Sequence, residues 1–328
     1  MRTPGQESGH PTWDLYVDEL VREHGSLAAV AHRIAETRGF REDTETVARA
    51  LRRLRARGAR TGGQWGERVL ATFGLPTSID ARLRFMGSYH SRFVDLPVAV
   101  CADLVQLWDR PPTSESRAGR TWLSLARATL ALRAHDREAA RMHLATARAV
   151  AGDDAPARIE IALGAAHVAA DADADEARVL LDEARPLLDR ISGADADCLR
   201  ARWVGQVSHA LNRAGEIERA EALHRGLPDT ATTAPFARSR RANGIAYARF
   251  RHGDGVEALR HAWLAVRYAG DAGHIRMRAM ALLMVARVAP QSEASEANDA
   301  RARAREIALT LGDDVLLSRC DASVRGRG

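Results

Sequence analysis

The most chemically distinctive stretch of this sequence is the arginine-rich run TVARALRRLRARGAR, at residues 46–60. It contains six arginines and no acidic residue: Arg49, Arg52, Arg53, Arg55, Arg57 and Arg60. A guanidinium group presents its N–H donors in a planar fork that matches the oxygens of a phosphate and the edge of a guanine. The run therefore has two interpretations, a helix that contacts DNA or the solvated face of an ordinary surface helix.

The spacing of the apolar residues indicates which side chains point outward. In a helix Val47, Leu51 and Leu54 form one stripe, so Arg49 and its basic neighbours lie on the opposite side. A helix in the major groove needs such a polar face, and arginines there give affinity that depends strongly on salt. The residues predicted to contact double-stranded DNA are Thr44, Thr46, Arg49, Arg52, Arg53 and Arg57. The alternative left open is a solvated face on which Glu45 pairs with Arg49 one turn away.

Three short amphipathic helices are expected to position this run. The first covers residues 13–23, the second follows Ser26 as its N-cap, and the third follows Asp43 or Thr44. Three such helices in close succession predict a small trihelical domain over residues 1–60.

Two of these segments carry a family resemblance. SLAAVAHRIAE at residues 26–36 and TETVARALRRLRARG at residues 44–58 resemble the second and third helices of bacterial helix-turn-helix and winged-helix regulators. In that group the helix with the TV-x-x-A pattern is typically the recognition helix, which enters the major groove. The resemblance implies a DNA-binding transcription regulator with residues 44–57 as its recognition helix.

The overall composition predicts an all-α protein. Aromatic residues make up 5% of the 328 residues, β-branched residues are sparse, and alanine and leucine dominate the apolar set. All 48 basic residues are arginine, which indicates GC-rich codon usage. The net charge of +5 therefore says little about DNA by itself, and only local clustering of arginine is informative.

Neither a metal nor a cofactor is expected. Cys101, Cys198 and Cys320 lie far apart, which fits reduced thiols in a cytoplasmic protein better than a zinc site or disulfides. The N-terminus lacks the apolar region of a signal peptide, and no apolar run reaches the ~18 residues that cross a membrane. The chain also lacks the short motifs of P-loop enzymes, serine hydrolases and zinc proteases, so we expect it not to be an enzyme.

Residues 61–118 are expected to form a helical connecting segment that ends near a Pro-Pro pair. Within it, YHSRFVD places His90 close to Arg92 and Asp95, residue types that also occur in catalytic sites. No supporting motif accompanies them. The aromatic residues of this stretch are therefore expected to pack in the core.

Residues 119–328 read as successive helix pairs. The best copy of the repeating unit has Ala246 in its first helix, a Gly253-Asp254 turn, and Ala258 and Ala265 in its second helix. The equivalent alanines of four copies are 37, 43 and 38 residues apart: Ala140, Ala177, Ala220 and Ala258. This pattern resembles tetratricopeptide (TPR) repeats, whose small residues let paired helices approach closely. The spacing exceeds the usual repeat of about 34 residues. The resemblance implies an αα-superhelical, TPR-like solenoid after the trihelical, helix-turn-helix-like (HTH-like) domain.

Such a solenoid presents a concave face that binds peptides or protein segments. The residues predicted to line it are Arg202, Gln206, Arg240, Arg241, Asn243 and Tyr247. The domain order is similar to that of bacterial peptide-sensing regulators, which implies that the repeat domain forms a homodimer and binds a signal. The alternative is a TPR scaffold or adaptor that binds proteins but not DNA.

Overall fold

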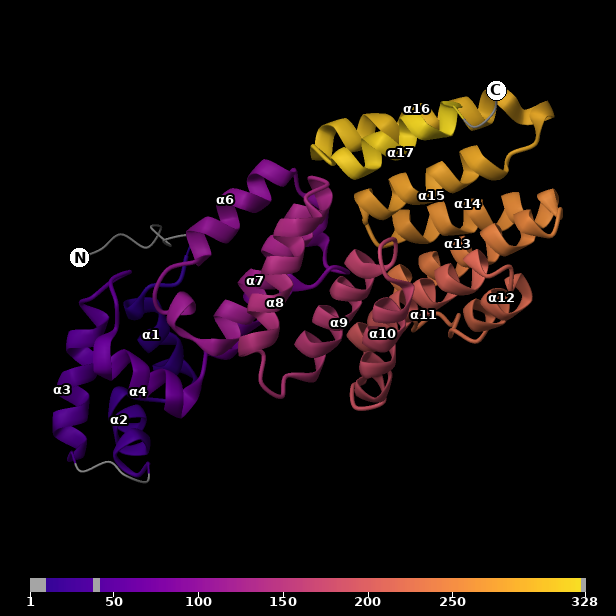
Figure 1. Ribbon diagram of the computed structural model, residues 1–328. Helices are drawn as coiled ribbons and strands as arrows, with labels where there is room; N and C mark the ends of the chain where they lie inside the picture. Colours follow the sequence, from indigo (N-terminus) through magenta and orange to yellow (C-terminus); the bar gives the residue numbers. More distant parts are fainter. Residues whose placement is uncertain (1–9, 38–41, 326–328) are drawn as a thin grey trace.

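The computed structural model describes residues 10–37 and 42–325. Across these two ranges all regular secondary structure is helical, with seventeen α-helices and three short 3-10 helices. The prediction of an all-α protein is confirmed. The chain forms an N-terminal lobe at one end of a curved array of helix pairs (Figure 1). None of the helices described is long and apolar enough to cross a membrane.

The N-terminal lobe contains four helices. They are α1 (Trp13–His24), α2 (Leu27–Ala35), α3 (Thr44–Arg55) and α4 (Gly63–Phe73). Ser26 and Asp43 accept hydrogen bonds from backbone N–H groups of α2 and α3, as N-caps do, whereas Thr12 makes no such bond to α1. Gly25 ends α1 with a φ of 90°, a conformation that favours glycine. Helices α1, α2 and α3 pack against one another, as the trihelical prediction requires.

The fourth helix and its flanking loops dock onto α1. Trp13 donates its indole N–H to the carbonyl of Arg60 at 2.9 Å, and Tyr16 donates its hydroxyl to the carbonyl of Gly74 at 2.6 Å. Gly62 and Gly66 lie directly against the Trp13 ring, where a β-carbon would overlap it. The predicted domain boundary at residue 60 therefore lies inside a continuously packed lobe.

The part of the predicted connecting segment that follows α4 packs onto the first helix of the array. It contains α5 (Thr77–Gly87), η1 (Arg92–Asp95), α6 (Val98–Trp108) and η2 (Thr113–Glu115). Helices α5 and α6 both contact α7, and one cluster of buried apolar side chains runs from Trp13 to Val168. The lobe and the start of the array thus share a single hydrophobic core.

The array is built from helices that pair in sequence order. They are α7 (Arg117–Arg133), α8 (Arg137–Val150), α9 (Ala155–Ala169), α10 (Ala174–Leu188), α11 (Ala194–Arg213), α12 (Ile217–Arg225), α13 (Pro235–Arg251), α14 (Gly255–Asp271), α15 (Ile275–Val288), η3 (Gln291–Glu293), α16 (Ala294–Leu311) and α17 (Asp314–Arg325). The four anchor alanines named above are all buried. Their small side chains allow close approach of the paired helices.

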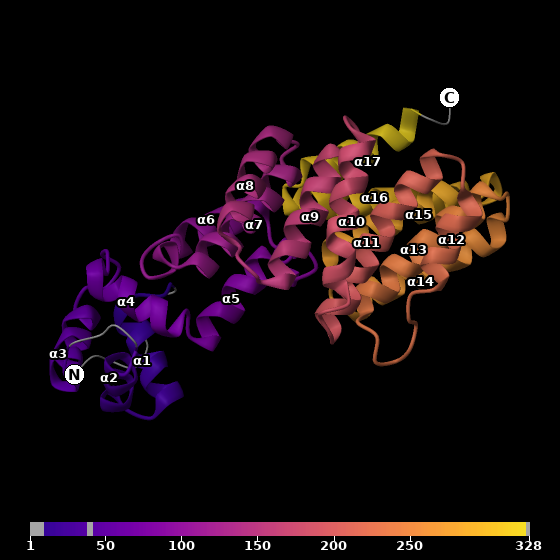
Figure 2. The same cartoon turned by 60° about the horizontal axis from the view of Figure 1, so that its bottom comes forward.

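The odd-numbered helices of the array form a closed inner ring. Helix α7 contacts α9, and the contacts continue through α11, α13, α15 and α17, which returns to α7. Both views place the C-terminal helices beside the start of the array (Figures 1 and 2). The even-numbered helices pack against this ring, each following its inner partner in the chain.

Buried ion pairs close the ring. Asp313, in the turn before α17, accepts hydrogen bonds from Arg133 Nε at 3.1 Å and from Arg276 Nε at 2.7 Å. The side chains of Asp313 and Arg133 are 0% and 1% exposed, respectively. Arg133 also donates to the carbonyls of Leu96 and Leu311. One guanidinium therefore joins α7 to the connecting segment and to the C-terminal turn.

Candidate functional sites

The outer face of α3 presents arginines to solvent. Val47, Leu51 and Leu54 are buried against the lobe, while Arg49 and Arg53 on the opposite side are exposed. Both views place α3 at the outer edge of the lobe, away from the array (Figures 1 and 2). The inward stripe predicted from the sequence is therefore present, and the basic side of the helix is open.

The first turn of α3 carries the predicted threonines. Thr44 and Thr46 are partly exposed, and the Thr46 N–H donates to Asp43 Oδ1 at 2.7 Å. Hydrogen bonds from Thr46 hold the pKa of Asp43 below its usual value. The cap fixes the start of the helix and therefore the direction in which its arginines point.

The predicted DNA-contacting arginines differ in the ion pairs and hydrogen bonds that they make with other groups of the protein. Arg49 Nε lies 3.9 Å from Glu45 with both side chains more than half exposed, so this pair is weak. Arg57 donates to the carbonyl of Thr61 at 2.6 Å. Arg52 and Arg53 have no ion-pair partner in the part of the chain that the structure describes. These two are the freest cations of the helix.

A hollow of about 450 Å³ lies at the C-terminal end of α3. Arg52 and Arg55 line it together with Asp14, Ala56 and Gly58. Arg55 is also paired with Asp18 of α1 at 2.5 Å. Acidic groups therefore border the basic face on this side.

The predicted concave-face residues divide into two groups, and the first lies inside the ring. Arg202 is buried, pairs with Glu160 of α9, and places its Cζ 4.6 Å from the centre of the Tyr89 ring. Burial would raise the pKa of Glu160, but Arg202 and His90 outweigh this effect and hold it low. Gln206 donates to the carbonyl of Leu163 at 2.8 Å. Arg202 and Gln206 therefore join α9 to α11 and are already engaged within the chain.

Two residues of α13 in this group have buried atoms without partners. Arg240 Nε and Asn243 Oδ1 make no hydrogen bond to any described group. One Nη of Arg240 lies against Gly205 of α11, at a distance that a β-carbon would not permit. The inward side of α13 thus offers both a donor and an acceptor.

The second group is engaged in local contacts. Arg241 pairs with Asp229 at 2.8 Å and donates to the carbonyl of Leu227 at 3.1 Å, so it secures the loop before α13. Tyr247 accepts a hydrogen bond from Arg251 at 3.0 Å and lies beneath the guanidinium of Arg287. These contacts stabilise α13 and its packing on α15.

The three residues of the YHSRFVD stretch that matched catalytic types do not come together. His90 lies between Glu160 and Asp195, at 3.3 and 3.2 Å. Asp95 accepts hydrogen bonds instead from the ring of His274 and from the backbone N–H of Arg276, at 3.1 and 2.8 Å. The segment thus anchors α9, α11 and α15 to one another from inside the ring.

No family model matches this chain, and comparison with curated proteins gives no match.

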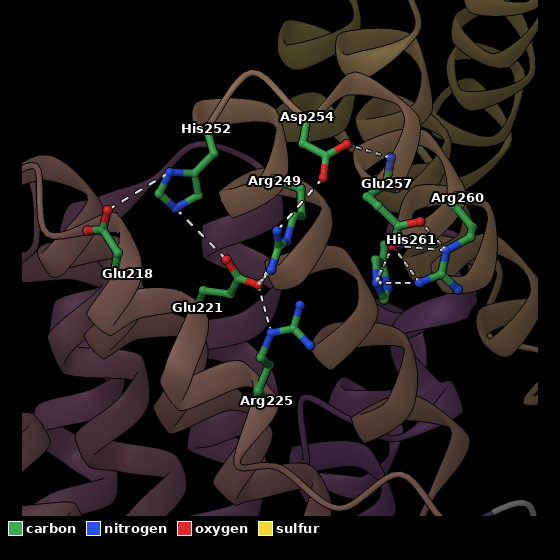
Figure 3. A network of polar contacts seen from close by, with 9 residues as sticks. All are labelled: Glu218, Glu221, Arg225, Arg249, His252, Asp254, Glu257, Arg260 and His261. Carbon is green, nitrogen blue, oxygen red and sulfur yellow. Dashed lines mark hydrogen bonds and ion pairs between the residues drawn. The ribbon is translucent and has the colours of Figure 1, made fainter.

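A further ionic network lies on α12, α13 and α14 (Figure 3). Glu221 accepts hydrogen bonds from Arg225 on its own helix and from Arg249 on α13, both at 2.7 Å. Burial would raise the pKa of Glu221, but these two arginines lower it below its usual value. The acids of this network are used to hold neighbouring helices, and no group of three metal-ligating residues exists among the residues described.

Several important residues of the interior are absent from the sequence-based prediction. They are Glu160, Arg276 and Asp313, and the contact of Tyr89 with arginines, beyond its expected place in the core, was not predicted either. Tyr89 and Arg276 are 187 positions apart yet hydrogen-bonded. No periodicity or motif connects such residues, so only the ring closure reveals them.

Proposed function

We propose that the protein is a DNA-binding transcriptional regulator that uses α3 as its recognition helix. The observation that carries this proposal is the two-sided character of α3. A fully buried apolar stripe faces the lobe, and exposed arginines project to solvent at the edge of the molecule, where Arg52 and Arg53 have no ion-pair partner among the described residues. This arrangement suits a helix that enters the major groove and contacts both bases and phosphates.

The packing of the lobe supports the same proposal. Helix α2 packs on α3, both helices begin at capped residues, and α1 braces them from behind. A rigid support of this kind allows side chains on α3 to reach base edges in a defined register. Thr44 and Thr46 in the first turn would add neutral hydrogen bonds to phosphates.

In this proposal the helical array is a TPR-like domain that binds a peptide or protein signal and holds two copies together. A homodimer would present two copies of α3 to successive major grooves, about 34 Å apart. A second function has its own supporting observation. Arg202 and Gln206 are tied to neighbouring inner helices, which suits a stable scaffold or adaptor that binds proteins without DNA.

Fluorescence anisotropy distinguishes these functions. A labelled duplex from upstream of the protein's own gene is titrated with wild type, with the Arg49→Ala/Arg53→Ala double variant and with the control Arg267→Ala, an exposed arginine of α14. We expect tight binding by the wild type and the control. In the double variant, each lost phosphate contact reduces the slope of log K against log salt by about 0.9.

Equal affinity for random duplex, unchanged by the double variant, would overturn the regulator proposal. The arginines of α3 would then be a solvated face, and the scaffold function would be preferred.

A further inference from the structure

Four arginines from four different inner helices converge on one tyrosine inside the ring. Arg202 and Arg276 place their Cζ atoms 4.6 and 5.5 Å from the centre of the Tyr89 ring, and Arg276 donates to its hydroxyl at 2.6 Å. Arg240 of α13, whose Nη lies against Gly205 of α11, and Arg319 of α17 add to the positive potential at the same hydroxyl. Burial would raise the pKa of Tyr89, but the four arginines lower it to about 8.

The carboxylates near this cluster already pair with Arg202, with Arg276 and with Arg133 outside the cluster. Glu160 pairs with Arg202, while Asp313 is divided between Arg276 and Arg133. The second oxygen of Asp313 accepts from the backbone N–H of Leu316 at 2.9 Å, and neither oxygen pairs with Arg240 or Arg319. These acids offset only part of the positive charge.

Two of the four arginines have no acidic partner, the solvent-exposed Arg319 and the more enclosed Arg240. Within residues 10–37 and 42–325, no acid lies within ion-pair distance of Arg240 or Arg319. The Nε of Arg240 is buried without any partner, as is the Oδ1 of Asn243 one turn further along α13. Burial lowers the pKa of Arg240; the Tyr89 hydroxyl raises it, but Arg202, Arg276 and Arg319 lower it further. A buried donor without a partner and an excess of positive charge together indicate a missing anion.

The site is accessible, yet the chain itself restricts its size. Arg319 is exposed, and Tyr89 and Arg240 are partly exposed, so solvent reaches the cluster. The segment from Tyr89 to Leu96 crosses the inside of the ring, contacting α9 and α11 near one end and α7 and α15 near the other. Because this segment occupies the interior, a compact ligand fits better than an extended peptide.

We propose that Arg202, Arg240, Arg276 and Arg319 bind the phosphate group of a small phosphorylated molecule inside the ring. A phosphate monoester carries a charge of about −1.5 to −2 at pH 7, which matches the two arginines that have no acidic partner. A single carboxylate would balance the charge of only one of them. Guanidinium forks on several sides can satisfy the phosphate oxygens at the same time. The unpartnered Oδ1 of Asn243, one turn along α13 from Arg240, would accept a hydrogen bond from the remainder of the ligand.

The test is isothermal titration calorimetry on the full chain with two probes, inorganic phosphate and glucose 6-phosphate. Ionic strength is held constant by replacing chloride, so that a general salt effect does not register as binding. The variants are Arg240→Gln and Arg319→Gln, with Arg267→Gln as the exposed control. We expect each of the first two to weaken binding by about tenfold or more, since a charge-assisted hydrogen bond is lost, and the control to bind within about twofold of wild type.

Three controls make the result decisive. Arg319 is exposed, so Arg319→Gln should fold normally even if Arg240→Gln does not, and circular dichroism checks both. The Arg49→Ala/Arg53→Ala variant should keep its phosphate affinity, because its changes lie on the distant lobe (Figure 1). The Arg240→Gln variant should in turn keep its DNA affinity in phosphate-free buffer, so this proposal and the DNA-binding proposal can fail separately.

Three outcomes would overturn the proposal. They are no measurable heat with either probe at millimolar concentration, equal affinity in the wild type and both interior variants, and loss of phosphate binding in the α3 double variant. Equal or tighter binding of a hexaglutamate peptide, lost in the same two interior variants, would also refute a phosphate site and indicate an acidic peptide instead.

Discussion

The buried carboxylate that closes the ring gives the sharpest test of the architecture. Asp313 is fully buried and accepts hydrogen bonds from Arg133, Arg276 and the N–H of Leu316. In Asp313→Asn the amide oxygen can still accept from the N–H of Leu316, but the NH2 group that replaces Oδ2 cannot accept from Arg133 and Arg276, so the substitution removes the charge and these two hydrogen bonds. Two buried guanidiniums then lose their counter-ion, and breaking a buried pair in this way typically costs about 3–5 kcal/mol.

The assay is urea unfolding of the full chain, followed by circular dichroism, together with hydrogen exchange of α13 and α17. The urea concentration at the midpoint of unfolding should fall. The exchange rates of the backbone amides should increase more in α17 than in α13. Asp321→Asn, on the helix α17 that follows Asp313, is the matched control, because Asp321 is more than half exposed and lies 3.7 Å from Arg305. An exposed pair of this kind contributes less than about 1 kcal/mol.

The same residue predicts a pH dependence. Burial would raise the pKa of Asp313, but Arg276 and Arg133, with the Leu316 N–H, lower it below its unfolded value. Its contribution to stability is therefore complete above the unfolded pKa and is lost as the pH falls through the folded pKa. A free energy of unfolding for Asp313→Asn within about 0.5 kcal/mol of wild type would refute the reasoning, because the ring would then not depend on this bridge.

Two further expectations concern the connecting segment. Burial would lower the pKa of His90, but Asp195 and Glu160 raise it. The stability that His90 contributes is therefore present below its unfolded pKa and is lost as the pH rises through its folded pKa. NMR titration of His90 in wild type and in Asp195→Asn checks this, and an unchanged pKa in the variant would contradict the expectation. Gly119→Ala should lower the free energy of unfolding by about 1–3 kcal/mol, because the added β-carbon would overlap the carbonyl of Thr113. Gly270 has open space around it, so Gly270→Ala should leave the protein unchanged or stabilise it by up to about 1 kcal/mol. Thermal unfolding measures both. Equal effects of the two alanines would show that the contact with Thr113 is not restrictive.

Local features of the fold were predictable from the sequence because they depend on neighbouring residues. The stripe of Val47, Leu51 and Leu54 fixes which side of α3 is buried, and Ser26 and Asp43 supply the cap oxygens at the expected positions. The regular spacing of alanines likewise predicted where paired helices approach closely.

The closure of the ring was not predictable, because it depends on contacts between distant parts of the chain. Arg133 and Asp313 are 180 positions apart, and Arg202 and Glu160 belong to different helix pairs. The curvature that unites them is the sum of small rotations between successive pairs, which no single motif encodes. For the same reason the sequence grouped Arg241 with Arg240, although the two adjacent side chains point to different surroundings.

The contrast among the arginines explains why composition alone says little about the function of this protein. Arg133 satisfies a carboxylate and two carbonyls at once in a fully buried position, a task that suits a planar fork and not the compact ammonium group of lysine. Arg53, by contrast, projects from α3 without an ion-pair partner in the described ranges. Arg240 differs from both, since it is largely enclosed yet lacks an acid. Arginine thus joins elements of the ring at Arg133, and we propose that it binds DNA at Arg53 and a small anion at Arg240; only its surroundings distinguish these three positions.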